Sequence, residues 1–368
     1  MTVESSRTFS TLRARFRALG DAGLFARLSD PSTLVEGALE LSRLAHDADD
    51  LGSFISIIAA AGLGAPILRA GGASALLANA IAGRAVLAVA ITEEGAGSDV
   101  AAMTSTITRG PDGALRLTGS KWNITNAPVA DAIIVFAVDA TTDDRFLVAV
   151  VVEPSAAGVR VLPALDMIGC KGSPTGGLVF EEVVIAEDRV LGRPREGRAL
   201  LDLGFVRERV LAPWPLLGKM ERVLADCLDH VEQRSQFGQS IHAFQYVQEK
   251  IVSSFDAMLH ARHLAERAIA SVASGKPDAA IASLAKAAAA DAAVHVFRSA
   301  IEIHASRGVQ SSKRYGEYLG DALCAQIAGG TRETHKKIVF GELRLDRARA
   351  RSGRASRLLR AARAGNHE

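Results

Sequence analysis

The spacing of apolar residues changes twice along the chain. Up to about residue 84 they recur at helical intervals, as in residues 34–44. They then occur in short runs rich in Val, Ile and Thr, and after about residue 197 the helical spacing returns. The pattern predicts an α+β protein with an N-terminal helical domain (1–84), a middle β domain (85–197), a C-terminal helical bundle (198–345) and a tail (346–368).

The middle segment contains short stretches of strand-like composition, separated by turn signals such as Pro111-Asp112-Gly113. The expected strands are residues 104–109, 114–118, 132–138, 146–152, 159–162 and 177–185. Several short strands at this spacing are typical of a β-barrel or sandwich rather than of alternating strands and helices.

The C-terminal segment has long Ala-rich helical patterns, such as residues 279–300, which follow the helix-breaking sequence Gly275-Lys276-Pro277. Long amphipathic helices joined by short links predict a bundle. The tail is rich in arginine, with Arg344, Arg347, Arg349, Arg351, Arg354, Arg357, Arg360 and Arg363. Two interpretations of the tail stay open: a solvated helix end, or a docking patch for an acidic partner.

Composition narrows the function classes. With 368 residues, of which 48% are hydrophobic, the chain can bury a large core. The net charge of +2 argues against nucleic acid or a membrane surface as a partner. No uninterrupted apolar run reaches the ~18 residues that cross a bilayer, and the first residues lack the layout of a secretory signal. We therefore expect a cytoplasmic protein.

Cysteine and histidine give little sign of a metal site. Cys170, Cys227 and Cys324 are odd in number and far apart, without a C-x-x-C pair, which argues against a disulfide framework and a zinc site. His304 and His335 stand alone among helical residues, where a structural role is more common than metal binding or catalysis. We expect no metal.

Two neighbouring motifs stand out in the middle segment. The apolar run 85–91 leads into the turn Thr92-Glu93-Glu94-Gly95-Ala96-Gly97-Ser98-Asp99, and the stretch 117–127 reads Leu-Thr-Gly-Ser-Lys-Trp-Asn-Ile-Thr-Asn-Ala. A turn of Gly and Ser after a strand exposes backbone N–H groups and short hydroxyls to a ligand, because glycine has no Cβ to hold the ligand away. Such a turn suits a flat cofactor with polar edges.

These motifs resemble the two flavin-binding signatures of the acyl-CoA dehydrogenase family. The resemblance continues at Arg234-Ser235-Gln236-Phe237-Gly238, with Gln245 at the family's spacing, and at Gly330-Thr331-Arg332-Glu333. It implies an N-terminal helical domain, a middle β-barrel or sandwich and a C-terminal four-helix bundle. It also implies FAD as the cofactor and a homo-oligomer, either a dimer or a tetramer.

The resemblance assigns residues to the flavin. Those expected in the same subunit are Thr92, Gly97, Ser98, Asn123, Ile124, Thr125, Thr331 and Glu333, with Lys121 holding the preceding turn. Arg234, Phe237 and Gln245 match positions that reach the FAD of a neighbouring subunit.

Two departures from the family pattern affect the flavin. At Asn123 the family often has an aromatic residue that stacks on the ring, whereas here Trp122 stands one place earlier and is expected to face the core. Glu302 puts a carboxylate where the family has an amide near the adenine and diphosphate, which predicts weaker FAD binding.

The catalytic base is the main question that the resemblance raises. Most members carry a Glu at the position of Gly329, which here keeps only its backbone N–H for the thioester carbonyl. Isovaleryl- and long-chain-specific members carry their Glu in a helix of the C-terminal bundle, at the position of Glu208. Glu208 is therefore the candidate base. Pro213 and Pro215 should end or kink its helix.

The resemblance implies FAD-dependent α,β-dehydrogenation of an acyl thioester, carried by CoA or by an acyl carrier protein. A Glu takes the α-proton and the β-hydride passes to the flavin. Two alternatives stay open: a flavin-dependent monooxygenase on the same fold, which needs no carboxylate base, and a catalytically inactive partner subunit. The sequence does not identify the electron acceptor.

Overall fold

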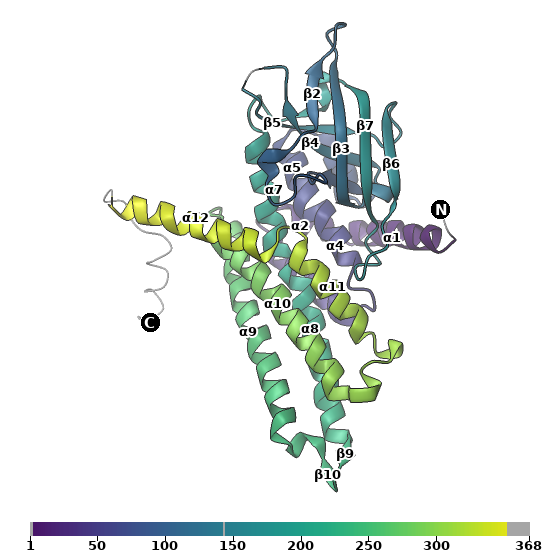
Figure 1. Ribbon diagram of the computed structural model, residues 1–368, viewed down its shortest axis with the longest axis vertical. Helices are drawn as coiled ribbons and strands as arrows, with labels where there is room; N and C mark the ends of the chain where they lie inside the picture. Colours follow the sequence, from purple (N-terminus) through teal and green to yellow (C-terminus); the bar gives the residue numbers. More distant parts are fainter. Residues whose placement is uncertain (1–2, 143, 352–368) are drawn as a thin grey trace.

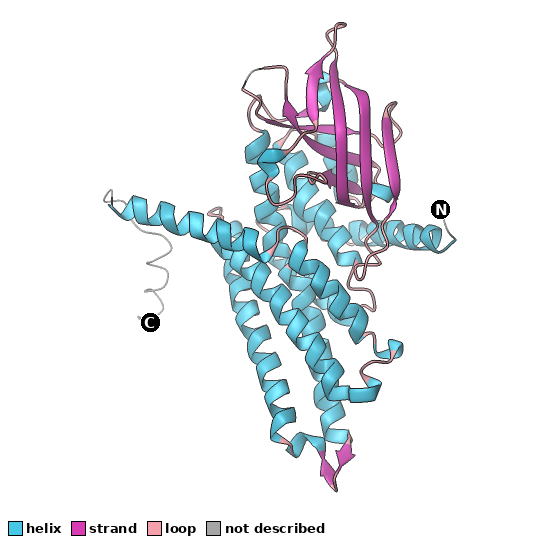
Figure 2. Cartoon of the chain, viewed as in Figure 1, coloured by secondary structure: helices cyan, strands magenta, loops and turns pink. Residues whose placement is uncertain are grey.

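A computed structural model describes residues 3–142 and 144–351 of the chain (Figure 1). A twisted sheet stands at one end, a long helical bundle extends to the other, and N-terminal helices lie between and beside them (Figures 1 and 2). The N-terminal elements are α1 (Val3–Asp21), α2 (Leu24–Ser29), α3 (Leu34–Asp47), α4 (Ser53–Ile57), the π-helical segment η1 (Ile58–Gly64), α5 (Ala65–Ala70) and α6 (Ser74–Ile81).

The middle segment forms an eight-stranded sheet. Its strands are β1 (Leu87–Ala90), β2 (Thr106–Arg109), β3 (Leu115–Thr125), β4 (Ala132–Asp139), β5 (Leu147–Val152), β6 (Val159–Ala164), β7 (Thr175–Ile185) and β8 (Val190–Leu191). The order is β6-β7-β3-β2-β4-β5-β8, and β1 also pairs with β4. The β1–β4 and β2–β4 pairs are parallel and the others are antiparallel.

Strand β3 is longer than expected. It continues beyond residue 118 to Thr125, so the second motif lies within the sheet. The register of β3 against β7 shifts between Lys121 and Ile124, and Asn123 has a φ of 54°. Such a bulge re-aims side chains. Trp122 is accordingly 37% exposed and lies over Gly177 of β7, so the expectation that it faces the core is wrong.

The C-terminal segment is helical. Its long helices are α7 (Gly197–Leu211), α8 (Pro213–Gln233), α9 (Gln245–Ala273), α10 (Ala279–His304), α11 (Tyr315–Ile327) and α12 (Arg332–Arg351). Helices α8, α9, α10 and α11 form the bundle, with α10 packed against the other three. The expected break falls between α7 and α8, where Pro213 occupies the first turn of α8 and its missing N–H costs nothing.

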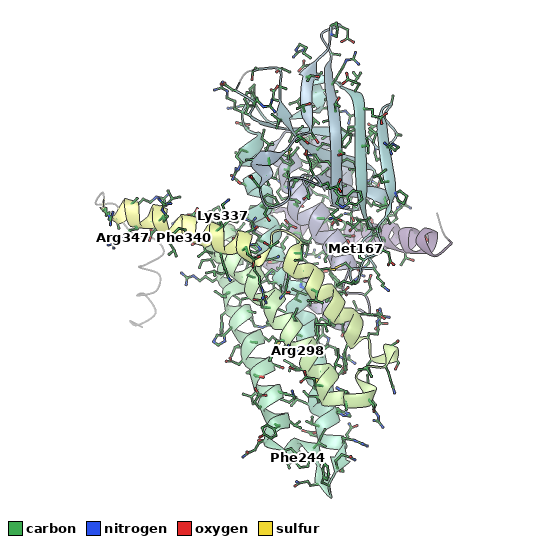
Figure 3. All side chains as sticks on the ribbon, viewed as in Figure 1. Met167, Phe244, Arg298, Lys337, Phe340 and Arg347 are labelled. Carbon is green, nitrogen blue, oxygen red and sulfur yellow. The ribbon has the colours of Figure 1, made fainter. Side chains whose placement is uncertain are left out.

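Helix α12 leaves the body of the molecule (Figure 1). Phe340 and Arg347 lie on this projecting helix (Figure 3), and Phe340 is 64% exposed. The helix continues to Arg351, past the expected bundle end at residue 345. Arg354, Arg357, Arg360 and Arg363 lie outside the described residues.

Two helical stretches are long and apolar enough to cross a membrane, Ser53–Ala70 and Ala279–Arg307. Polar and charged residues such as Ser56, Arg69, Lys286 and Asp291 interrupt these stretches in the sequence. Within the protein, 83% and 67% of their apolar windows are buried against other elements. They account for much of the helical core, where small residues such as Ala285, Ala289 and Ala293 let α10 approach its neighbours closely.

Candidate active site

The two sequence motifs meet in a cavity of about 300 Å³ between the sheet, α7 and the link from α11 to α12. We call it the motif cavity. Nine of the fourteen predicted site residues line it: Thr92, Gly97, Ser98, Asn123, Ile124, Thr125, Glu208, Gly329 and Thr331. Residues separated by more than two hundred positions therefore share one surface, although no single motif contains both Glu208 and the Gly/Ser turn.

Glu208 lies in the last turn of α7, and its carboxylate has an unusual environment. Its Oε2 atom is buried and has no hydrogen-bond partner among the described residues. Burial raises the pKa of the carboxyl group, and the nearby cations Arg209 and Lys286 only partly oppose this rise. A buried carboxylate with a raised pKa is a suitable proton acceptor.

Gly329 makes room for this carboxylate. A Cβ built on Gly329 would lie 3.1 Å from Oε1 of Glu208 and 3.2 Å from its carboxyl carbon. The φ of Gly329 is 67°, a conformation that side chains of L-residues disfavour. The carboxylate of Glu208 thus occupies the space where a side chain at position 329 would begin.

Two cationic side chains donate hydrogen bonds to the carbonyls of the Gly329–Gly330 link. Arg209 donates from Nε to the carbonyl of Gly329 at 3.3 Å, and Lys286 donates from Nζ to the carbonyl of Gly330 at 2.7 Å. Desolvation lowers the pKa of Lys286 to about 8. The sequence analysis did not identify Lys286. Its only signal is a lone cation within the Ala-rich buried pattern of α10, where charge normally has a partner.

A second, narrow cavity of about 50 Å³ adjoins the motif cavity. Glu208, Arg209 and Gly329 line both, so the carboxylate stands at their junction. The other walls of the narrow cavity are mostly apolar and come from α4, η1, α8 and α11: Leu51, Phe54, Ile55, Ile58, Ala212, Pro215, Leu216, Lys286, Asp321, Ala325 and Ala328.

The turn at residues 92–99 is held by a buried ion pair. Lys121 donates from Nζ to Oε1 of Glu93 at 2.9 Å and to the carbonyl of Ile91 at 3.0 Å. Glu93 also accepts from Thr104 and Ser105, and these donors outweigh its desolvation and lower its pKa to about 2. Lys121 thus holds the turn as expected, whereas the role of Glu93 was not anticipated.

The remaining predicted residues lie elsewhere. Arg234 ends α8, Phe237 lies in the short hairpin of β9 (Ser235–Gln236) and β10 (Gln239–Ser240), and Gln245 begins α9. Phe237 is 95% exposed, and the neighbouring Phe244 marks this far tip of the bundle (Figure 3). These residues do not line the motif cavity of their own chain. Their assignment to a neighbouring subunit's flavin stays a prediction.

Glu302 and Glu333 also lie outside the motif cavity. Glu302 forms ion pairs with Lys250 and Arg298, and the hydrogen bond from Lys250 lowers its pKa. Its charge is therefore compensated, which weakens the expectation that it repels the diphosphate. Glu333 is exposed in the first turn of α12.

The motif cavity fits the ring system of a flavin. Its lining includes the hydroxyl-bearing residues Thr92, Ser98 and Thr125 and apolar residues such as Ile91 and Ile124. A Cβ built on Gly97 would meet nothing within 4 Å, so the turn leaves open space beside the cavity.

Comparisons with known proteins agree with this arrangement. Residues 88–183 match the family model described as acyl-CoA dehydrogenase, middle domain, and residues 195–343 match acyl-CoA dehydrogenase, C-terminal domain. Isovaleryl-CoA dehydrogenase from Solanum tuberosum is 34% identical over 73% of this chain and 65% of its own length. L-prolyl-[peptidyl-carrier protein] dehydrogenase from Pseudomonas fluorescens is 31% identical over 70% of this chain and 68% of its own.

Solved structures show the same fold. Butyryl-CoA dehydrogenase from Megasphaera elsdenii superposes with a TM-score of 0.81 at 27% identity, covering 89% of each chain. The prolyl acyl carrier protein oxidase AnaB superposes with a TM-score of 0.84 at 21% identity, covering 93% of this chain and 99% of its own. The sequence match spans about 65% of the length of the first curated relative. The expected α+β fold is confirmed, and the chain belongs to the acyl-CoA dehydrogenase family.

Proposed function

We propose that this protein removes two hydrogens from the Cα–Cβ bond of an acyl thioester, with Glu208 as the base and FAD as the cofactor. One observation carries the proposal: the carboxylate of Glu208, whose buried Oε2 has no hydrogen-bond partner among the described residues, occupies the side-chain position of residue 329 at the junction of two cavities. The family's usual base is absent at that position, and a second carboxylate fills its place from another helix.

The environment of Glu208 suits the reaction. The α-proton of a thioester is weakly acidic, so a base of raised pKa is better matched to it than an ordinary solvated carboxylate. Glu208 takes the proton, the C–H electrons form the new double bond, and the β-hydrogen leaves with its own electron pair. The N–H of Gly329 would stabilise charge on the thioester oxygen. Bound FAD would accept the β-hydrogen as hydride, a step that side chains cannot supply.

Arg209 and Lys286 support the reaction without accepting a proton. Their hydrogen bonds to the carbonyls of Gly329 and Gly330 fix the direction of the link that presents the Gly329 N–H. Their positive charges also favour the ionised form of Glu208. Burial therefore raises the pKa of Glu208, and these cations keep part of the carboxyl group ionised.

The carrier is either CoA or a carrier protein, and both deliver the acyl group on a pantetheine arm. Relatives at similar identity are named for each kind of carrier. The arginines of α12 would suit an acidic carrier protein. The position of Arg234, Phe237 and Gln245 at the bundle tip supports a homo-oligomer in which one subunit completes the flavin site of another.

The visible spectrum of the purified protein tests the proposal. A yellow protein whose flavin is bleached by short acyl-pantetheine thioesters without oxygen is a dehydrogenase. Bleaching that requires a separate reductant, followed by oxygen-dependent product formation, would instead identify a monooxygenase. Flavin that no thioester reduces, despite tight thioester binding, would identify an inactive partner subunit.

A further inference from the structure

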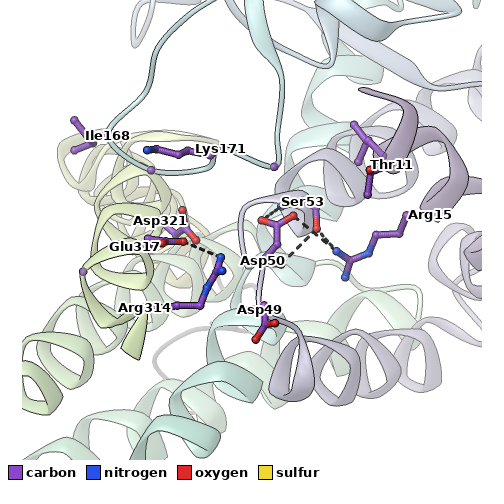
Figure 4. A pocket seen from close by; sticks show the side chains of 14 residues that line it. Thr11, Arg15, Asp49, Asp50, Ser53, Ile168, Lys171, Arg314, Glu317 and Asp321 are labelled. Carbon is purple, nitrogen blue, oxygen red and sulfur yellow. Dashed lines mark hydrogen bonds and ion pairs between the residues drawn. The ribbon is translucent and has the colours of Figure 1, made fainter. Parts of the chain in front are cut away.

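Asp321 stands where the narrow cavity meets a larger one. It lines the narrow cavity together with Glu208, and it also lines a polar cavity of about 530 Å³ between α1, α4, the loop 168–172 and α11. Figure 4 shows Asp321 on the α11 side of this polar cavity, facing the wall that carries Asp50 and Ser53. A chain that enters the narrow cavity beside Glu208 would therefore reach Asp321 at the other end.

We propose that the acyl group accepted by this protein ends in an amine, which pairs with the carboxylate of Asp321. The inference rests on the proposed function, because it takes the acyl chain to begin beside Glu208. It assigns Asp321 as a specificity-determining residue at the distal end of the acyl chain.

The carboxylate of Asp321 is buried, and one of its two oxygens accepts a hydrogen bond. The residue is 8% exposed, and its Oδ1 accepts the backbone N–H of Cys170. Within residues 3–142 and 144–351, the structure records neither a donor for Oδ2 nor an ion pair to this side chain. Desolvation raises the pKa of Asp321 to about 6, and Asp50 and Glu317 add to the rise. A buried carboxylate in this state gains from a cationic partner.

The nearby cations have partners or lie on the rim, although the buried Nε of Arg314 has no hydrogen-bond partner among the described residues and its charge opposes the rise in the pKa of Asp321. Arg314 pairs with Glu317 at 2.7 Å, and Arg15 lies 3.9 Å from Asp50 and donates to Ser53. Four carboxylates line the polar cavity against three cations. The carboxylates are Asp49, Asp50, Glu317 and Asp321, and the cations are Arg15, Lys171 and Arg314. This excess of carboxylates favours a positively charged group over a negatively charged one at the distal end of the acyl chain.

The narrow cavity determines which end of the substrate points to Asp321. Between Glu208 and Asp321 its walls are mostly apolar, and its volume of about 50 Å³ admits an alkyl chain. The amides of a pantetheine arm would lose their hydrogen bonds to water there. The arm must instead leave through the motif cavity, past polar groups such as Ser98.

The length of α11 bounds the acyl chain. Asp321 and Ile327 are separated by about 9 Å along this helix at 1.5 Å per residue. Ala328 follows Ile327 and lines both cavities beside Gly329. The acyl chain between Glu208 and Asp321 is therefore short, and a five-carbon group with a terminal amine is the probe chosen for the test.

Calorimetry on the FAD-loaded protein tests the inference without turnover. The two ligands are thioethers, S-(5-aminopentyl)-pantetheine and S-hexyl-pantetheine, which differ by an amine in place of a methyl group and cannot cyclise or react. We expect the amine to bind 10- to 100-fold more tightly, as one buried charge-assisted hydrogen bond allows. Asp321→Asn should abolish this preference and keep an acceptor for the Cys170 N–H.

Glu317→Gln is the matched control. It removes one carboxylate from the same helix and the same polar cavity, but that carboxylate is already paired with Arg314. The control should keep the preference for the amine. Equal binding of the two ligands by the wild-type protein, or a preference that survives Asp321→Asn, would overturn the inference. The wild-type comparison decides even if Asp321→Asn fails to fold.

The same preparation separates this inference from the proposed function. Anaerobic bleaching by hexanoyl-pantetheine reports dehydrogenation and does not depend on Asp321. Bleaching without an amine preference in binding would leave the proposed function intact and reject the role of Asp321. An amine preference without bleaching by any acyl thioester would reject the proposed reaction and retain the binding site.

Discussion

The carboxylate of Glu208 occupies the space that the missing side chain of Gly329 leaves open. The glycine has lost the side chain that most of the family uses, and its missing Cβ leaves space for a carboxylate from α7. The sequence placed Glu208 as a candidate by its match to a family segment. It could not show the 3.1 Å approach to position 329, because that contact joins residues 121 positions apart.

Lys286 gives a prediction for pH dependence. The base must be ionised to act, so the rate should rise with pH through the raised pKa of Glu208. Lys286→Met removes a cation that favours the ionised form, and this should move the rise to higher pH. An opposite charge nearby is worth roughly one pKa unit or more. At pH values below the pKa of Glu208 the rate should therefore fall about tenfold, and it should recover in alkaline buffer.

The pH–rate profile of anaerobic flavin reduction measures this effect. Lys286→Arg is the control, since it keeps the charge and a donor for the carbonyl of Gly330. A profile that falls equally at all pH values in Lys286→Met would mean that Lys286 acts only through the shape of the Gly329–Gly330 link.

At the scale of elements, the helical and strand periodicities located most of the fold. Expected strands such as 132–138 lie within a residue or two of observed ones, because their apolar residues face a shared core. The second motif was expected in a strand region, and β3 does extend through Thr125, but the bulge between Lys121 and Ile124 was not predicted because no local pattern marks it. The parallel pairing of β1 with β4 also depends on long-range contacts that no local pattern contains.

The buried pair that anchors the motif turn gives a stability prediction. Lys121→Met leaves Glu93, which is 5% exposed, without its cation. Breaking a buried pair in this way costs about 3–5 kcal/mol, and the hydrogen bonds from Thr104 and Ser105 should keep the loss near the lower value. Flavin content should fall as well, because the 92–99 turn loses its anchor.

Urea unfolding of the FAD-loaded protein measures this loss. Arg116→Met on the same strand is the control, because its pair with Asp112 is partly exposed and is worth less than about 1 kcal/mol. Equal losses in the two variants would show that the buried pair does not anchor the turn.

At the scale of the whole molecule, the site exists only because three parts of the chain meet. The sheet supplies the motif turn, α7 supplies Glu208, and the link from α11 to α12 supplies Gly329. The resemblance to the family predicted this meeting. The positions of Lys286 and Asp321 could not be predicted, because each is a single charged residue in a helical pattern with no motif around it.

The buried His335 should make the free energy of unfolding of the whole protein depend on pH in the acid range. His335 is 2% exposed, neither of its ring nitrogens has a hydrogen-bond partner in the described part of the chain, and burial lowers its pKa to about 3. Between about pH 6 and pH 3 the unfolded chain therefore binds a proton that the native state does not, so stability falls as the pH falls. This one residue should contribute on the order of 1 kcal/mol per pH unit.

Unfolding free energies measured at pH 7 and pH 5 check this contribution. His335→Leu should lose less stability between the two pH values than the wild-type protein does. His263→Leu, which removes an exposed ring, should leave the difference unchanged. An unchanged pH dependence in His335→Leu would contradict the account of a neutral buried imidazole.

The rate of anaerobic flavin reduction by Glu208→Gln tests the central claim most directly. Glutamine keeps the size and the hydrogen-bonding groups of the side chain but cannot take the α-proton. If Glu208 is the base, reduction by an acyl-pantetheine thioester should slow by roughly 10²–10⁴-fold, while flavin content and thioester binding stay close to wild type. Near-normal flavin reduction by Glu208→Gln would contradict the account and remove Glu208 from the mechanism.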